Sequence, residues 1–230
     1  SLMIHSHTFK FLMKDLLELK GNAFTKRIPG WVFSLSNKQI GWLLKGLFSG
    51  DGHAGKQEIV ISLSSRKLLE DIQTLLLNFG IILRIGSQHK KDKTYPGRIS
   101  SLKFWESFKD IGFLQKVKKE RLEQLCNKKS THDTSDIIPL EKEILKELKK
   151  IKLYYHHNSN NQLGRRKLQQ ILFKHKDWLN DNFTLRTKLE KLAHSDIFWD
   201  QVREIKKLPL NECFVYDLSV LGDENFIANN

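Results

Sequence analysis

The stretch "LLKGLFSGDGH", residues 43–53, decides the expected fold, because it joins an apolar helical pattern to a single acidic residue. Four large apolar side chains recur at helical spacing, and they are Leu43, Leu44, Leu47 and Phe48. Glycine inside a helix costs roughly 1 kcal/mol relative to alanine, so Gly46 and Gly50 indicate that another backbone approaches this helix closely. Asp51 lies at the helix end, where the Asp-Gly pair predicts a turn.

A capping box marks the beginning of this helix. Ser36 is followed three residues later by Gln39, and Leu35 and Ile40 are spaced as a hydrophobic staple. The pattern predicts a helix that starts at residue 36 and is built to pack against a second helix. The tryptophans lie in apolar helical patterns or beside turns and are predicted to be core residues, namely Trp31, Trp42, Trp105, Trp178 and Trp199.

The residues that follow predict a strand and then a helix. The segment "KQEIVISLS", residues 56–64, alternates apolar and polar side chains with period two, which is typical of a strand. A helix is predicted to start at Ser64 or Ser65, and Gly80 is its expected stop.

Two further strands and another helical stretch complete the pattern. The segments "IILRIGSQ" and "GRISSLKF" predict strands on either side of the basic turn "HKKDKTYPG". A helical stretch is then predicted over residues 104–126. The sum is an α+β unit in which an antiparallel sheet keeps one face free.

The charge of the chain favours a polyanionic partner. The 39 Lys and Arg exceed the 26 Asp and Glu, for a net charge of +13, and residues 84–129 alone hold thirteen basic and five acidic residues. Nucleic acid is a better candidate than a membrane surface, although a solvated lysine-rich face is the plain structural alternative. No apolar run reaches the roughly 18 residues of a membrane span.

Cysteine usage gives no sign of a disulfide framework or a zinc site. Cys126 and Cys213 lie far apart and form no Cys-x-x-Cys pair. We therefore expect a soluble, intracellular and cytoplasmic protein that is associated with the nucleoid when it is bound to DNA.

A second, smaller domain is predicted beyond the polar run "KKSTHDTSD". Pro139 is expected to open a helix that continues through Lys150. Two helical segments follow, and residues 165–191 carry eight basic and three acidic residues, which suits contacts with phosphates. The expected domains are residues 1–129, 130–205 and 206–230, the last of them strand-rich.

The segment "GDGHAGK", residues 50–56, satisfies the G-x-x-x-x-G-K pattern of a phosphate-binding loop, but its context is wrong. That loop follows a strand, precedes a helix and has Ser or Thr after the lysine. Here a helix precedes the segment, a strand follows it, and Gln57 stands after the lysine. Asp51 therefore needs another explanation: it is either an ordinary turn residue or one of two carboxylates that two halves bring together for Mg²⁺.

The segment "LKGLFSGDG", residues 44–52, resembles the nine-residue signature of the LAGLIDADG homing endonucleases, with Leu, Gly, Leu, Asp and Gly at positions one, three, four, eight and nine. "KRIPGWVFSLS", "LLLNFGI" and "FKDIGFLQKVKKERL" also resemble the family in the same order, over about residues 23–129. The resemblance implies an αββαββα unit with an antiparallel saddle sheet, whose signature helix forms the interface with a second half. Ser49 stands where the signature more often has its first Asp.

The resemblance also implies site residues and a cofactor. Asp51 would bind Mg²⁺ with the Gly50 carbonyl beside it, and Lys118 would lie near the catalytic water, with Lys116 and Lys119 as alternatives. The residues expected to contact duplex DNA are Ser62, Ser65, Arg84, Ser87, Gln88, Lys90, Lys91, Lys93, Arg98, Lys103, Lys119, Arg165, Arg166 and Lys167.

The last segment resembles a different family. "FVYDLSVLGDENFIANN" is similar to the penultimate splicing block of inteins, and "SDIFWDQVREIKKL" before it also resembles inteins with an embedded endonuclease. Asp217 matches the Asp of that block, whereas Glu224 stands where many inteins have His. Without a splice junction at Ser1 or a His before Asn230, the chain is expected to be unable to splice.

Together these resemblances imply the second half of an intein-encoded endonuclease that hydrolyses phosphodiester bonds in duplex DNA with Mg²⁺. Its partner would be a second LAGLIDADG half, either in the same longer chain or in a second copy. The alternative is a DNA-binding module without catalysis, or an RNA-splicing cofactor, on the same fold.

Overall fold

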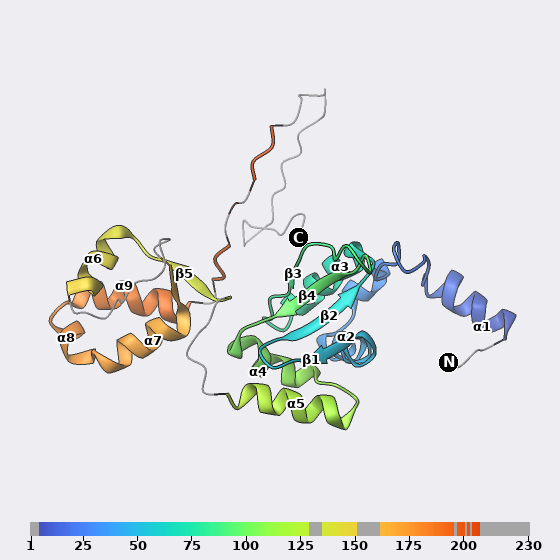
Figure 1. Cartoon of the computed structure of the whole chain (residues 1–230), viewed down its shortest axis with the longest axis horizontal. Coiled ribbons are helices and arrows are strands. Elements are labelled where there is room, and N and C mark those ends of the chain that lie inside the picture. Colours follow the sequence, from blue (N-terminus) through green and yellow to red (C-terminus); the bar gives the residue numbers. More distant parts are fainter. Residues whose placement is uncertain are drawn as a thin grey trace.

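The structure is a computed structural model that describes residues 5–128, 135–150, 162–195, 197–200, 202 and 204–207. It contains an α/β unit built around a four-stranded sheet and a smaller helical unit with a two-stranded sheet (Figure 1). Asp217 and the strands expected near the end of the sequence lie outside the described residues.

Helix α2 (Asn37–Asp51) is the predicted signature helix. The capping box is confirmed, since the Ser36 N–H donates a hydrogen bond to Gln39 Oε1 at 3.2 Å. The predicted Asp-Gly turn is wrong, because Asp51 is the last helical residue and Gly52 already begins strand β1 (Gly52–Ala54). A Cβ at Gly52 would lie 2.8 Å from the Phe48 carbonyl oxygen, so the direct passage from helix to strand requires glycine there.

The sheet is fully antiparallel and has the order β1-β2-β4-β3, with β2 at Ile59–Leu63, β4 at Tyr95–Ile99 and β3 at Arg84–Ile85. Helix α3 (Arg66–Leu77) connects β2 to β3, and α4 (Leu102–Ile111) follows β4. The chain order from α2 to α4 is therefore αββαββα, which confirms the predicted α+β fold. One face of the sheet is buried with the helices in a single core that includes Phe48, Ile61, Leu69, Ile72 and Phe108.

The boundaries of some elements differ from the prediction. The last predicted strand ends at Ile99, because its final residues turn into α4. The helical stretch over 104–126 is interrupted at Gly112, whose φ of 64° lies in the left-handed region that favours glycine. A second helix, α5 (Lys116–Cys126), follows this break. Gly80 also has a φ of 64°, which confirms it as the stop after α3.

Ser65 caps α3 and does not reach the surface. Its hydroxyl accepts a hydrogen bond from the Leu68 N–H at 3.2 Å and donates one to the Lys26 carbonyl at 2.7 Å. The residue is fully buried. The prediction that Ser65 contacts DNA is wrong, because its hydroxyl is buried and both donates and accepts a hydrogen bond within the protein.

Replacing this cap should destabilise the α/β unit. We expect Ser65→Ala to lower the free energy of unfolding by about 1 to 2 kcal/mol, since it removes an N-cap and leaves a carbonyl without its donor. Ser64→Ala is the matched control, because the Ser64 hydroxyl makes no hydrogen bond within the described residues. Urea unfolding of both variants measures the difference, and equal midpoints would contradict the capping role.

The helical unit has a core of its own. Strand β5 (Ile137–Pro139) pairs antiparallel with β6 (Gln162–Gly164), and the helices are α6 (Lys142–Lys150), α7 (Arg165–Lys174), α8 (Lys176–Asn180) and α9 (Phe183–His194). Leu148, Leu168 and Leu189 are fully buried in it. The expectation that Pro139 opens a helix is wrong, because Pro139 ends β5 and the helix begins at Lys142.

The N-terminal residues form short helical turns that extend from the α/β unit (Figure 1). Helix α1 (His7–Phe11) continues into a π-helical turn, η1 (Leu12–Leu16), and a 3-10 helix, η2 (Gly30–Ser34), precedes α2. Several of their large apolar side chains are exposed, among them Phe11, Leu16 and Phe33. Within the described residues, none of the helices combines the length and apolar character needed to cross a bilayer.

Candidate functional site

Asp51 presents its carboxylate at the exposed end of α2. The side chain makes no hydrogen bond or ion pair with any described residue. Gly50, immediately before it, is also exposed, and a Cβ there would meet nothing within 4 Å. The carboxylate and the neighbouring backbone are therefore accessible to a ligand.

Lys118 from α5 is fixed against the backbone on either side of this acid. Its Nζ donates hydrogen bonds of 2.6 Å to the carbonyl oxygens of Ser49 and Gly52, which flank Gly50 and Asp51 in the chain. The side chain is half-buried, whereas Lys116 and Lys119 are exposed. Of the three lysines considered from the sequence, Lys118 is the one whose ammonium lies against the end of α2.

Two residues that sequence reasoning did not select hold this arrangement together. The buried hydroxyl of Ser49 accepts a hydrogen bond from the Leu114 N–H at 2.8 Å, and Gln115 Nε2 donates to the Ser49 carbonyl at 2.9 Å. Ser49 thereby attaches the segment before α5 to the end of α2, which places Lys118. The capping preference of Gln115 is weak, so no local pattern pointed to it.

The open face of the sheet carries a row of side chains that crosses all four strands. The registers pair His53 with Val60, Val60 with Arg98, and Arg98 with Arg84. Their neighbours Ile59 and Ile99 are fully buried on the core side, so alternation along the strands puts this row on the opposite face. Ser62, also predicted to face DNA, is exposed two residues beyond Val60 on the same face.

The two arginines of this row already have protein partners. Arg98 forms an ion pair with Glu58, and Arg84 donates to the Ser135 carbonyl at 3.3 Å, which links β3 to the segment before β5. His53 was not predicted as a site residue. The signal that could have found it is its place one residue into a strand that starts directly at the end of the signature helix.

The connection between β3 and β4 is exposed and basic. Ser87, Gln88, Lys90, Lys91 and Lys93, all predicted to contact DNA, lie on its surface. Asp92 stabilises the loop from within: it accepts hydrogen bonds from the hydroxyl and the N–H of Thr94, at 2.8 and 3.2 Å, and these lower the pKa of the carboxyl group. Asp92 is therefore charged and hydrogen-bonded within the loop, whereas the lysines are exposed to solvent.

Lys103 and Arg166, two further predicted DNA contacts, line the same cavity of about 440 Å³ between α4 and the helical unit. Glu106 and Asp136 line it as well, so its charge is mixed. Lys167 and Lys119 are exposed on α7 and α5.

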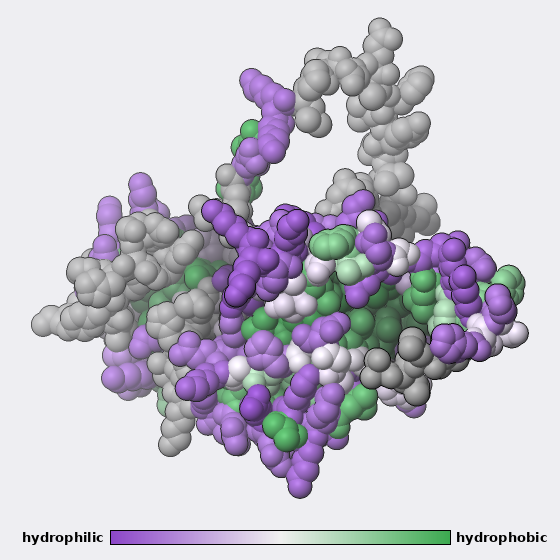
Figure 2. All heavy atoms as spheres, turned by 45° about the vertical axis from the view of Figure 1, so that its right-hand side comes forward, coloured by the Kyte–Doolittle hydropathy of each residue, from purple (hydrophilic) through white to green (hydrophobic). Residues whose placement is uncertain are grey.

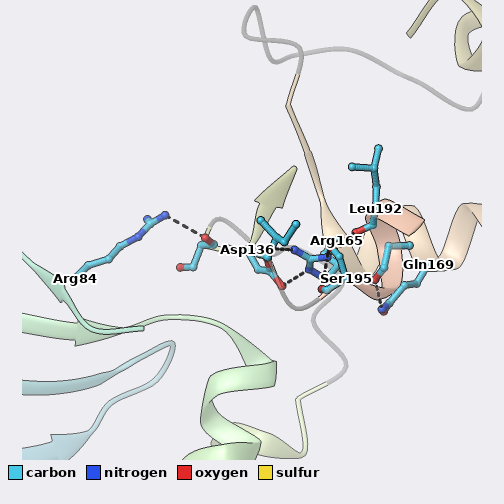
Figure 3. A network of polar contacts seen from close by, with 9 residues as sticks. Arg84, Asp136, Arg165, Gln169, Leu192 and Ser195 are labelled. Carbon is cyan, nitrogen blue, oxygen red and sulfur yellow. Dashed lines mark hydrogen bonds and ion pairs between the residues drawn. The ribbon is translucent and has the colours of Figure 1, made fainter. Parts of the chain in front are cut away.

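Arg165 is an interior residue rather than a surface cation (Figure 3). It is 5% exposed, and its Nε bonds to Asp136 Oδ2 at 2.8 Å. The other nitrogens donate to the carbonyls of Leu192, Ser195 and Ile197, at 2.5, 2.9 and 2.6 Å. The predicted DNA contact of Arg165 is wrong, because the guanidinium is buried and each of its three nitrogens donates to Asp136 or to residues at and after the end of α9.

One face of α2 has no partner within the described residues. A Cβ at Gly46 or Gly50 would meet nothing within 4 Å, and Trp42 on the same stripe is 61% exposed. The prediction that Trp31, Trp42 and Trp199 are core residues is wrong, because all three are exposed, whereas Trp105 is buried. Figure 2, in which the right-hand side of Figure 1 comes forward, shows a band of exposed hydrophobic residues between hydrophilic ones.

Comparison with known proteins agrees with this architecture. Residues 38–128 match the family described as LAGLIDADG-like domain. The chain is 30% identical over 226 residues to a glutamine–fructose-6-phosphate aminotransferase of Methanocaldococcus jannaschii, covering 94% of this chain and 20% of that protein. It is 28% identical over 251 residues to the RNA polymerase subunit Rpo1C of the same organism, covering 96% and 28%.

A third relative is the replicative DNA helicase DnaB of Synechocystis sp., 29% identical over 231 residues, which cover 90% of this chain and 26% of the helicase. The chain thus spans between a fifth and just over a quarter of the length of these three relatives. Residues 38–128, which match the LAGLIDADG-like domain family, contain nearly all of α2, the four-stranded sheet, Asp51 and Lys118.

Proposed function

We propose that this chain is one half of an intein-encoded homing endonuclease, which hydrolyses phosphodiester bonds at a specific site in duplex DNA with Mg²⁺. The observation that carries this proposal is that Asp51, exposed and without a protein partner in the described chain, lies between Ser49 and Gly52, whose carbonyl oxygens both bind the ammonium of Lys118. Such a pair suits a site where a cation and a phosphate meet.

The donors at the end of α2 fit a Mg²⁺ ion. Mg²⁺ in proteins commonly uses one or two carboxylates, keeps several waters and contacts substrate phosphates. Asp51 supplies a carboxylate and Gly50 a neighbouring carbonyl oxygen. When bound there, the ion would lower the pKa of a coordinated water and offset charge on the phosphate.

Lys118 has a defined part in this proposal. An ammonium group has three donors, and two of them are engaged by the Ser49 and Gly52 carbonyls. The third can donate to a water or a phosphate oxygen beside Asp51. The two carbonyl bonds position the ammonium, so its charge need not be reoriented when substrate binds.

The described residues supply only half of a two-acid site. They contain no group of three or more His, Cys, Asp or Glu side chains able to hold a metal ion. Domains of the LAGLIDADG family bind DNA and act in pairs. The uncovered stripe of α2 at Trp42, Gly46 and Gly50 is where we propose that a second half packs, bringing a second carboxylate beside Asp51.

The open face of the sheet is the proposed DNA-binding surface. It presents His53, Arg84 and Arg98 in one row, with the lysines of the β3–β4 connection beyond its edge. The exposed lysines of this connection would displace counterions condensed on the phosphates, so binding should weaken steeply with salt.

The relatives support the intein part of the proposal. An aminotransferase, an RNA polymerase subunit and a helicase have unrelated names, yet each matches this chain over 226 to 251 residues and over 28% of its own length at most. A segment shared by otherwise different enzymes is expected of an inserted element. The resemblance of residues 195–230 to inteins, with Asp217, points the same way.

The test is metal-dependent cleavage of a selected site. Selection from a random duplex library with the full chain supplies a preferred sequence, which is then placed in a supercoiled plasmid. We expect nicked or linear product with Mg²⁺ and none with EDTA, because the proposed site needs the ion to activate water. A plasmid without the site is the control.

Two outcomes would contradict this expectation. Specific binding that leaves the plasmid supercoiled in Mg²⁺ would instead identify a non-catalytic DNA-binding module. Binding to RNA in preference to duplex DNA would favour the RNA-splicing cofactor.

A further inference from the structure

The helical unit separates its charges between two surfaces. Around one cavity, formed by α6 and the start of α9, four acidic residues outnumber two lysines: Glu141, Glu143, Glu147 and Asp181 against Lys146 and Lys188. The outer surface of α7 is different: its cavity, of about 810 Å³, is lined by Arg166, Lys167, Lys174 and His175 and by no acidic residue. The α7 surface therefore carries an excess of basic side chains, whereas acidic residues predominate around the first cavity.

Four side chains of α7 form one outward face, which we call the α7 face: Lys167, Gln170, Phe173 and Lys174. Lys167, Gln170 and Lys174 are three and four residues apart and so lie along one side of the helix. Leu168 and Ile171 point the other way and are buried in the core. The core and α9 thus support the helix from behind.

The two neighbouring glutamines of α7 have different roles. Gln169 Nε2 donates to the Ala193 carbonyl at 3.0 Å and attaches α7 to the end of α9. The Gln170 amide makes no hydrogen bond within the described residues. Arg165 fixes the first turn of α7 through the bonds already described (Figure 3). Arg165 and Gln169 thus attach α7 to the rest of the unit, while the half-buried Gln170 amide has no protein partner in the described chain and can bind a ligand.

Phe173 is the most exposed large apolar side chain of the described residues, at 88%, and Lys174 follows it directly in the chain. A membrane-binding helix would need a broad apolar stripe, and one phenylalanine does not make one. In the major groove, glutamine pairs bidentately with adenine N7 and N6, phenylalanine contacts the thymine methyl group, and lysine contacts phosphates. The α7 face contains each of these side chains within three turns.

We infer that α7 inserts into the major groove of duplex DNA and reads an A·T base pair, with Gln170 on the adenine and Phe173 on the thymine methyl. Lys167 and Lys174 hold the phosphates on either side. This inference rests on the proposed DNA-binding function and adds a second reading surface, separate from the four-stranded sheet. The footprint of the chain therefore extends past the segment covered by the sheet.

The first experiment measures affinity and its salt dependence for the full chain on its selected duplex. The Lys167→Ala/Lys174→Ala double variant is expected to bind roughly tenfold more weakly at about 0.1 M salt, with a logarithmic salt slope lower by about two. Lys146→Ala/Lys149→Ala on α6 is the matched control and should keep the parental slope. An unchanged slope in the α7 variant would place the DNA elsewhere.

The second experiment tests base reading. Repeating the selection with Gln170→Ala should lower the preference at a single A·T position by about tenfold or more, since a bidentate pair contributes about 1 to 3 kcal/mol of discrimination. Phe173→Ala should weaken the same position, whereas Phe183→Ala, at the other exposed phenylalanine of the unit, should not. If both α7 variants select the parental sequence, α7 does not read bases.

These experiments distinguish a failure of the proposed DNA-binding function from a failure of the inference on α7. If the parental chain has no affinity for duplex DNA, the proposed function fails and the inference with it. If the parental chain binds and cleaves its site while the α7 variants keep the parental affinity and footprint, only the inference on α7 is wrong.

Discussion

Asp51→Asn should abolish Mg²⁺-dependent cleavage while DNA affinity stays close to that of the parental chain. The substitution removes one negative charge from the proposed metal site and barely changes the side-chain volume. Loss of a group that stabilises transition-state charge typically lowers kcat by about a hundredfold to a thousandfold, and loss of the ion itself would add to this. Plasmid cleavage and fluorescence anisotropy on the same duplex separate the two effects.

Asp110→Asn is the matched control for this experiment. Asp110 is also an exposed acid near a helix end, and it makes no hydrogen bond or ion pair within the described residues. Its replacement changes the net charge equally and should leave the cleavage rate unaltered. If Asp51→Asn cleaves at the parental rate, Asp51 is only the last residue of a helix.

Arg165→Met should produce the largest loss of stability among the single changes considered. The substitution leaves Asp136 buried without the cation that now lies 2.8 Å from it, and it also removes the donors to three backbone carbonyls. Breaking a buried ion pair by removing one partner costs about 3 to 5 kcal/mol. We expect the helical unit to unfold at much lower urea than in the parental chain.

Trp178 is partly buried against the core of the helical unit and reports on its unfolding by fluorescence. Arg166→Met is the control, since Arg166 is the next residue on the same helix and is only partly buried. A midpoint for Arg165→Met equal to that of the control would mean that the ion pair contributes no net stability.

The helices and strands of the α/β unit could be predicted from the sequence because their signals are local. The capping box at Ser36, the stop at Gly80 and the period-two pattern before Ser64 lie within a few residues of the elements they define. Strand β1 was missed because three residues are too few for a periodic pattern. Glycine at position 52 was read as a turn, whereas the structure needs it for a close backbone contact.

The lysine that lies near Asp51 could not be identified from local sequence signals. The family resemblance favoured Lys118, with Lys116 and Lys119 as alternatives, but local sequence signals do not separate the three, because all lie on one basic helix. What distinguishes Lys118 in the structure is its contact with Ser49, 69 residues earlier in the chain. No periodicity encodes a contact of that separation.

The sequence by itself determined the element order, the signature helix and the acid at its end, since these follow from the spacing of neighbouring residues. Only the tertiary structure decided which polar side chains have protein partners: it buried Ser65 and Arg165, left Asp51 exposed, and left the half-buried Gln170 without a hydrogen bond to any described residue. The physical reason is that the burial of a polar group depends on partners brought in from distant segments. Arg165 and Arg166 are identical in type and adjacent in sequence, yet Arg165 is the one whose position on α7 turns it toward Asp136 and the end of α9.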